Sequence, residues 1–164
     1  MIRSVENLVD ATWGVDRPAR PINQVKILET KFTGQETLEK FNLVTKKLDG
    51  KLDCLLVTTL DDICWILNLR GADIDYNPVF FSYLILYPGE ETKATLYVDD
   101  VKVEGVKDYL ASNKVTVASY SQVSEDLIKI NADKKRIGVH TKTCNADLYQ
   151  LVKDVAVIQN DNII

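Results

Sequence analysis

Apolar residues recur with two spacings from residue 34 onwards. The first spacing is helical, and its positions are Leu38, Phe41, Val44 and Leu48. Such a series predicts a helix with one buried stripe. Thr33 and Glu36 have the spacing of a capping box and would begin this helix, and Gly50 would end it. The second spacing is a short continuous run, residues 52–57, which is typical of a strand buried on both faces.

The same two patterns alternate along the rest of the chain. Helices are predicted over 60–69, 101–111, 121–130 and 145–152, and strands over 79–87, 94–98, 115–118, 136–140 and 155–158. The Pro88-Gly89 turn favours antiparallel pairing of the strands on either side. This order predicts an α/β layered domain with a mixed sheet of about six strands flanked by helices.

Residues 1–33 do not show this regular pattern of apolar residues. They contain a short helical piece at 5–10, Trp13, and two prolines that predict an extended connector over 16–21. The segment has no core of its own and is interpreted as the tail and linker of a preceding domain, lying on the domain that follows. The main domain is therefore placed at 34–164.

Composition narrows the class of protein. A net charge of −4 and 46% hydrophobic residues describe an ordinary globular chain without a basic surface for nucleic acid. No apolar run reaches the length of a membrane span, and the first residues lack a signal-peptide core. We therefore expect a cytoplasmic protein with no membrane or nucleic-acid partner. Cys54 and Cys64 stand in apolar contexts and are predicted to be buried thiols.

Residues that could carry chemistry are few. The chain has one histidine, His140, and no metal-binding motif, nucleophile elbow or glycine-rich phosphate loop. Two acidic pairs, Asp61-Asp62 and Asp99-Asp100, stand where helices are predicted to begin, and carboxylates there favour the helix dipole. We expect no catalytic residue, no metal ligand and no cofactor in this chain.

One stretch contains residues that could do more than stabilise the fold. A loop of mixed polarity, 70–78, joins the apolar helix at 60–69 to the apolar strand at 79–87. Arg70, predicted at the helix C-terminus, could stabilise that end of the helix. It could also bind a carboxylate outside the domain.

The same stretch carries a family resemblance. Residues 59–74 read TLDDICWILNLRGADI and residues 76–83 read YNPVFFSY. Both closely resemble the middle domain of cytosolic-type aminopeptidase P. Trp13, residues 16–21 (DRPARP) and residues 32–34 (FTG) are similar to the family's junction between its first and middle domains.

The resemblance implies a creatinase/prolidase N-terminal-like domain in three layers. In complete members of the family, a C-terminal pita-bread domain binds two Mn²⁺ ions through two Asp, one His and two Glu residues, and it releases the residue before an Xaa-Pro bond. None of the segments with these ligands resembles anything in this chain. The implied partners are the missing catalytic domain, the peptide substrate and a second copy in a dimer.

The resemblance also suggests a role for the loop. N-terminal domains of related enzymes form the mouth of the active site and contribute subunit contacts. By this comparison the candidates for a substrate rim are Trp65, Arg70, Asn77 and Pro78. An alternative function is a protein-interaction module of a regulatory, inactive relative. An independent small enzyme is disfavoured by the lack of catalytic motifs.

Overall fold

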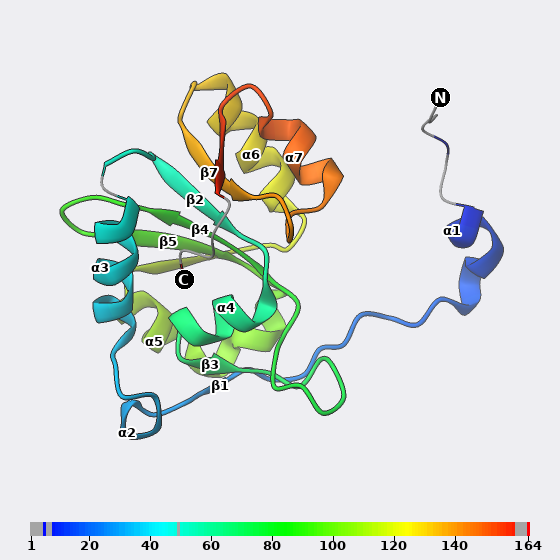
Figure 1. The fold of residues 1–164 in the computed structure, drawn as a ribbon. Helices are drawn as coiled ribbons and strands as arrows, with labels where there is room; N and C mark the ends of the chain where they lie inside the picture. Colours follow the sequence, from blue (N-terminus) through cyan, green and yellow to red (C-terminus); the bar gives the residue numbers. More distant parts are fainter. Residues whose placement is uncertain (1–4, 6–7, 49, 160–163) are drawn as a thin grey trace.

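Short apolar strands alternate with amphipathic helices and form a mixed sheet with the order β6-β5-β4-β2-β7-β8 (Figure 1). The computed structural model describes residues 5, 8–48, 50–159 and 164. The strands are β2 (Cys54–Val57), β4 (Tyr83–Tyr87), β5 (Lys93–Tyr97), β6 (Val115–Ala118), β7 (Ile137–His140) and β8 (Ala156–Gln159). β4 is antiparallel to β2 and β5, and the other neighbouring pairs are parallel. The predicted six-stranded mixed sheet and the hairpin are confirmed.

Helices cover both faces of this sheet, so the domain has three layers (Figure 1). One face packs against α3 (Thr37–Leu48), α4 (Leu60–Ile66) and α5 (Lys107–Ser112), and the other against α6 (Gln122–Ala132) and α7 (Ala146–Val152). In β2, Leu55 and Val57 belong to the first core, whereas Cys54 and Leu56 belong to the second. This alternation explains the continuous apolar run, because both faces of the strand are buried.

The prediction that Thr33 begins the helix containing Phe41 is wrong. Thr33 ends a separate short helix, α2 (Thr30–Thr33), and Gly34 follows it with a φ of 75°. α3 begins at Thr37, where the Glu39 carboxylate accepts a hydrogen bond of 3.0 Å from the Glu36 backbone N–H. The carboxylate half of the same capping device is therefore present, moved three residues along the chain.

The buried stripe of α3 also differs from the prediction. Phe41, Val44 and Leu48 are buried as expected, but Leu38 is 39% exposed. Lys40 is buried instead, with 1% of its surface accessible. The reason lies outside the helix, because Lys40 finds hydrogen-bond acceptors in the last turn of α4 and in the segment just after it.

The helix predicted over 60–69 is shorter in the structure. α4 ends at Ile66, and Asn68 has a φ of 52°, which redirects the backbone. The next two residues form β3 (Leu69–Arg70), which pairs antiparallel with β1 (Lys26–Ile27) in a second, two-stranded sheet. The sequence pattern predicted neither of these strands, because each has only two residues.

Two other predicted elements differ in the structure, one in where it begins and one in the type of helix. The strand predicted over 79–87 joins the ladder only from Tyr83, since the carbonyls of Pro78 and Val79 accept hydrogen bonds from the preceding loop. The helix predicted over 101–111 is a 3-10 helix, η2 (Asp100–Val106), followed by α5. Asp99 caps η2 through a side-chain bond to the Val101 N–H, which agrees with the expected role of that acidic pair.

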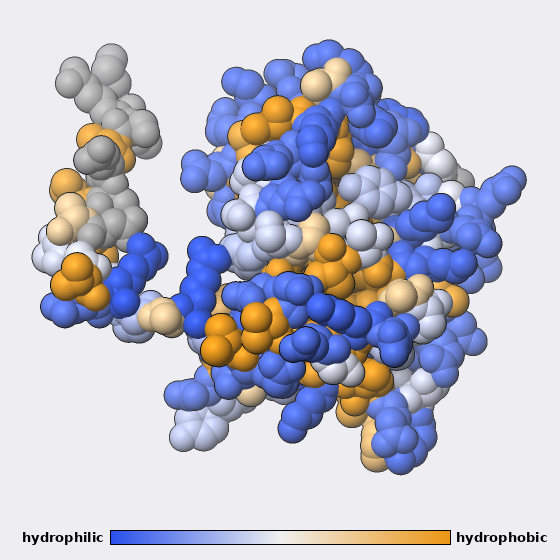
Figure 2. Space-filling view, turned by 180° about the vertical axis from the view of Figure 1, so that it is seen from behind, coloured by the Kyte–Doolittle hydropathy of each residue, from blue (hydrophilic) through white to orange (hydrophobic). Residues whose placement is uncertain are grey.

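The N-terminal segment projects from the rest of the molecule (Figures 1 and 2). Its helix is α1 (Leu8–Trp13), and the short helix η1 (Gly14–Asp16) follows. α1 thus does not lie on the domain, contrary to expectation, and its apolar side chains are exposed: Leu8, Val9 and Trp13. Contact with the domain is present at Arg20, whose guanidinium lies 4.4 Å from the Tyr120 ring centroid. The boundary at 33/34 remains a prediction, and β1 lies on its N-terminal side.

Candidate functional site

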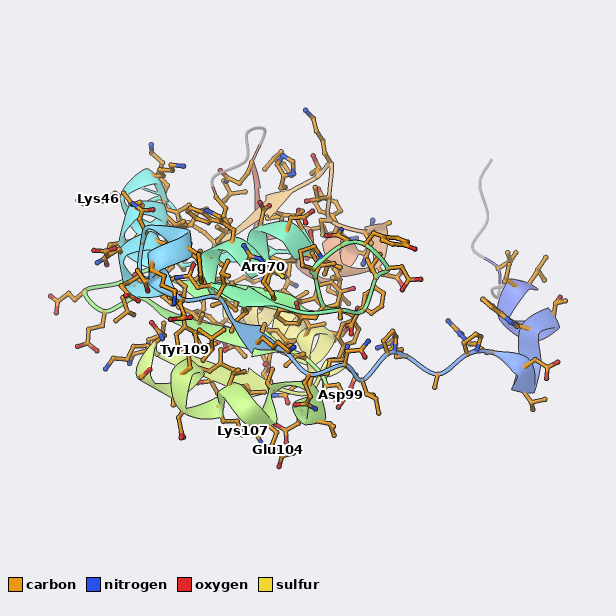
Figure 3. All side chains as sticks on the ribbon, turned by 90° about the horizontal axis from the view of Figure 1, so that it is seen from below. Lys46, Arg70, Asp99, Glu104, Lys107 and Tyr109 are labelled. Carbon is orange, nitrogen blue, oxygen red and sulfur yellow. The ribbon has the colours of Figure 1, made fainter. Side chains whose placement is uncertain are left out.

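The four predicted rim residues lie on one continuous stretch between α4 and β4. Trp65 is in the last turn of α4 and is 39% exposed, and Arg70 is the second residue of β3. Asn77 and Pro78 end the loop that follows. Figure 3 shows the Arg70 side chain beside α4, on the side of the domain that carries β1.

The loop itself is a tight hairpin, residues 71–78, called here the rim hairpin. The Gly71 N–H donates to the Pro78 carbonyl at 3.0 Å, and the Asn77 N–H donates to the Ile74 carbonyl at 3.1 Å. Its tip holds Tyr76, which is fully exposed and has a φ of 62°. A bulky residue with positive φ is unusual, and an ordered surrounding must hold it there.

Gly71 is required by the close approach of two chain segments. A Cβ atom at this position would lie 2.5 Å from the Phe80 Cβ and 2.7 Å from the Val79 carbonyl oxygen. Only glycine leaves room for the hairpin to close against the following segment. The sequence marked this residue as a turn signal but did not indicate the contact.

A buried ion pair supports the rim hairpin from inside. Asp73 and Lys102 are joined by a hydrogen bond of 2.5 Å, and their side chains are 0% and 3% exposed. The same carboxylate oxygen of Asp73 accepts the Phe81 N–H at 2.7 Å, which ties the hairpin to the start of β4. The other oxygen, Oδ1, has no hydrogen-bond partner among the described residues. Sequence reasoning missed this pair, and its one signal was a lysine between two valines.

A second buried lysine lies next to Trp65. Lys40 Nζ donates to the Trp65 carbonyl at 2.8 Å and to Asn68 Oδ1, and it lies 4.3 Å from the Trp65 ring centroid. Burial, followed by repulsion from Arg70, lowers the pKa of the Lys40 ammonium. The Lys40 ammonium thus lies against the Trp65 ring. This residue was also missed, because a lysine on a helix is usually solvated.

Arg70 makes the contact that the helix-end interpretation requires, although it lies in a strand. Its Nη1 donates to the Cys64 carbonyl at 2.9 Å and to its neighbour's carbonyl, Leu69, at 2.7 Å. The Cys64 carbonyl belongs to the last turn of α4, where acceptors lack a helical partner. This contact holds the guanidinium in one orientation beside Trp65.

Outside the rim hairpin, one pocket brings acidic side chains and the histidine together. A pocket of about 280 Å³ at the ends of β2 and β7 is lined by Asp61, Asp62 and His140, among others. Within residues 5, 8–48, 50–159 and 164, no three His, Cys, Asp or Glu side chains are close enough to hold a metal ion. The described part of the chain thus does not fit a metal site.

The cysteines behave as apolar residues. Cys54 and Cys64 are buried, as predicted, and Cys144 is partly buried. Burial raises the pKa of Cys54 to about 12 and that of Cys64 to about 11, so neither is a thiolate at neutral pH.

In the described residues no helix is long and apolar enough to cross a bilayer.

The fold agrees with that of a known family. Residues 16–164 match the family model of the creatinase/prolidase N-terminal domain, and the chain belongs to that family. Among its relatives, a probable Xaa-Pro aminopeptidase P of Chaetomium globosum is 46% identical over 123 residues, covering 74% of this chain. One from Neurospora crassa is 45% identical over 132 residues, covering 79%. The resemblance to aminopeptidase P is confirmed.

Solved structures give the same relationship. The X-prolyl aminopeptidase of Caenorhabditis elegans, described as a cytosolic enzyme with a di-nuclear active site, matches 96% of this chain with a TM-score of 0.85 and 27% identity. The Xaa-Pro dipeptidase of Bacillus anthracis matches 76% with a TM-score of 0.55 and 13% identity, which supports the fold alone. This chain covers 26% of the C. elegans enzyme, and it spans about a fifth of the curated relatives (19% for both fungal proteins).

Proposed function

We propose that this chain is a non-catalytic middle domain of an Xaa-Pro aminopeptidase whose catalytic domain lies in the rest of a longer polypeptide. The observation that carries the proposal is the match to the C. elegans enzyme, in which nearly all of this chain corresponds to about a quarter of a di-nuclear aminopeptidase. In the two fungal relatives the match takes in 74% and 79% of this chain and 19% of each relative. The substrate would be a peptide with proline in second position, and the compartment would be the cytoplasm.

The metals of such an enzyme would be held outside this chain. The described residues offer no set of three ligands, so no step of the hydrolysis is assigned to them. Two Mn²⁺ ions would be bound by the catalytic domain, where they would activate the attacking water. The contribution of this domain is then to position and screen that site, and to take part in subunit contacts.

The part of the domain assigned to the entrance is the rim hairpin with Trp65. Its tip is exposed, while its base is fixed by Gly71 and by the buried Asp73–Lys102 pair. The pair, together with the Phe81 N–H, gives Asp73 of the hairpin a defined set of partners in the domain interior. The hairpin therefore presents Tyr76 in a defined position, as a wall beside a substrate requires.

The first experiment tests the domain assignment. The complete polypeptide, supplied with Mn²⁺, should release the first residue from an Xaa-Pro peptide, whereas the isolated 164-residue chain should show no turnover. Turnover by the isolated chain would refute the non-catalytic assignment. An inactive complete polypeptide would instead favour the regulatory interaction module.

The second experiment tests the rim. Tyr76→Ala in the complete polypeptide should lower kcat/KM while the melting temperature stays nearly constant, because the Tyr76 side chain is exposed. Phe32→Ala is the matched control, since Phe32 is an aromatic residue with 68% exposure on α2, away from the hairpin. Equal kinetic effects of the two variants would contradict a specific role for the hairpin.

A further inference from the structure

Arg70 and Lys40 are two neighbouring cations that have no carboxylate partner among the described residues. Neither residue has a salt bridge with any described residue, and their hydrogen bonds go to carbonyl or amide oxygens. These acceptors are uncharged, so no carboxylate among the described residues balances the two positive charges. Buried and half-buried charges are normally paired, since an unpaired charge loses its hydration without gaining a counterion.

Two other cations of the domain, one buried and one on the surface, are paired with carboxylates. Lys102 is paired with Asp73 inside the domain. Arg136 is paired with Asp53 on the surface: its Nε donates to Oδ2 at 3.2 Å and its Nη2 donates to Oδ1 at 2.9 Å. This two-point contact is the geometry by which arginine binds a carboxylate most tightly.

The corresponding edge of Arg70, formed by Nε and Nη2, makes no hydrogen bond to a described residue. The two hydrogen bonds of the guanidinium both use Nη1. The hydrogen bonds of Nη1 fix the orientation of the guanidinium plane. The Arg70 side chain therefore loses little conformational entropy when a carboxylate binds the opposite edge. Lys40 and Arg70 bind the adjacent carbonyls of Trp65 and Cys64, so a second positive charge lies near this edge.

We propose that the Nε/Nη2 edge of Arg70, with Lys40 behind it, is a carboxylate-binding site next to Trp65. The site rests on the proposed function only for the source of the carboxylate. One source is the C-terminal carboxylate of a short peptide substrate at the entrance, and the other is an Asp or Glu side chain of the polypeptide outside these 164 residues. Both present the same planar anion to the same edge.

The site itself is tested without enzymatic activity. Acetate is titrated into the 164-residue chain at constant ionic strength, with chloride as the balancing anion, and the Nε–H signals of the five arginines are followed by NMR. The Arg70 signal should shift and saturate in the millimolar range. The Arg136 signal is the internal control, because Asp53 already occupies its edge. A flat Arg70 signal, or equal shifts of both, overturns the proposal.

Kinetics of the complete polypeptide distinguish the two sources. If the peptide supplies the carboxylate, Arg70→Lys should raise KM about tenfold for a peptide with a free C-terminus and leave its C-terminal amide unaffected, because lysine lacks the two-point fork. If the polypeptide supplies it, both peptides respond alike, and acetate no longer shifts Arg70 in the complete polypeptide. An inactive polypeptide would refute the proposed function, whereas the acetate titration would still decide the site.

Discussion

Removing the charge of Lys102 should test how strongly the rim hairpin depends on its buried ion pair. In Lys102→Met the Asp73 carboxylate stays buried, and among the described residues it keeps only the Phe81 N–H as a donor. Breaking a buried pair from one side costs about 3–5 kcal/mol of the free energy of unfolding. For a chain of this size, that corresponds to a fall in melting temperature of roughly 6–20 °C.

The assay is urea unfolding of the 164-residue chain followed by circular dichroism. Lys107→Met is the matched control, because Lys107 forms a 3.1 Å pair with Asp100 in which the side chains are 47% and 69% exposed. That exposed pair should contribute at most about 1 kcal/mol. Adding Asp73→Leu to Lys102→Met should recover part of the lost stability, since no unpaired charge remains. A loss for Lys102→Met no larger than for the control would refute the reasoning.

Three further outcomes follow from local contacts. Gly71→Ala should lower the free energy of unfolding by about 1–3 kcal/mol, since its Cβ would lie 2.5 Å from the Phe80 Cβ. Gly105→Ala should be tolerated, because a Cβ there would have no atom within 4 Å. Urea unfolding of the two variants compares their stabilities. The Arg136 guanidinium lowers the pKa of Asp53, so the pair stabilises the fold above the unfolded pKa of about 4 and loses its effect as the pH falls through the lowered value. Unfolding from pH 7 to pH 2 should therefore show the stability of Arg136→Gln converging on that of the parent chain at the acid end. With a thiol reagent at pH 8, Cys144 should react before the two buried cysteines, and simultaneous reaction of all three would contradict the burial described here.

The candidate site was only partly predictable. The stretch from Trp65 to Pro78 could be selected from its sequence, and Arg70 was considered both as a helix-end cation and as a carboxylate ligand. The contact of Arg70 with the last turn of α4 agrees with the first interpretation, but its position in a strand does not. The second interpretation continues as a proposal. Tyr76 had no signal in the pattern, because its exposure and positive φ depend on how the hairpin closes.

The sequence by itself determined the layered architecture. Helical and strand spacings report which side chains share a face of a local element. That local information was enough for the six strands of the main sheet, the helices between them and the β4–β5 hairpin. The family was also readable from residues 59–83, because a long ungapped motif needs no structure to be compared.

Only the tertiary structure decided which polar residues are inside. Lys102 meets Asp73 across 29 positions and Lys40 meets Asn68 across 28, so no periodicity connects the partners. The two-stranded sheet of β1 and β3 likewise pairs Lys26 with Arg70. A buried charge is stable only where a distant segment supplies its acceptors, and the packing of the chain alone determines where those segments meet.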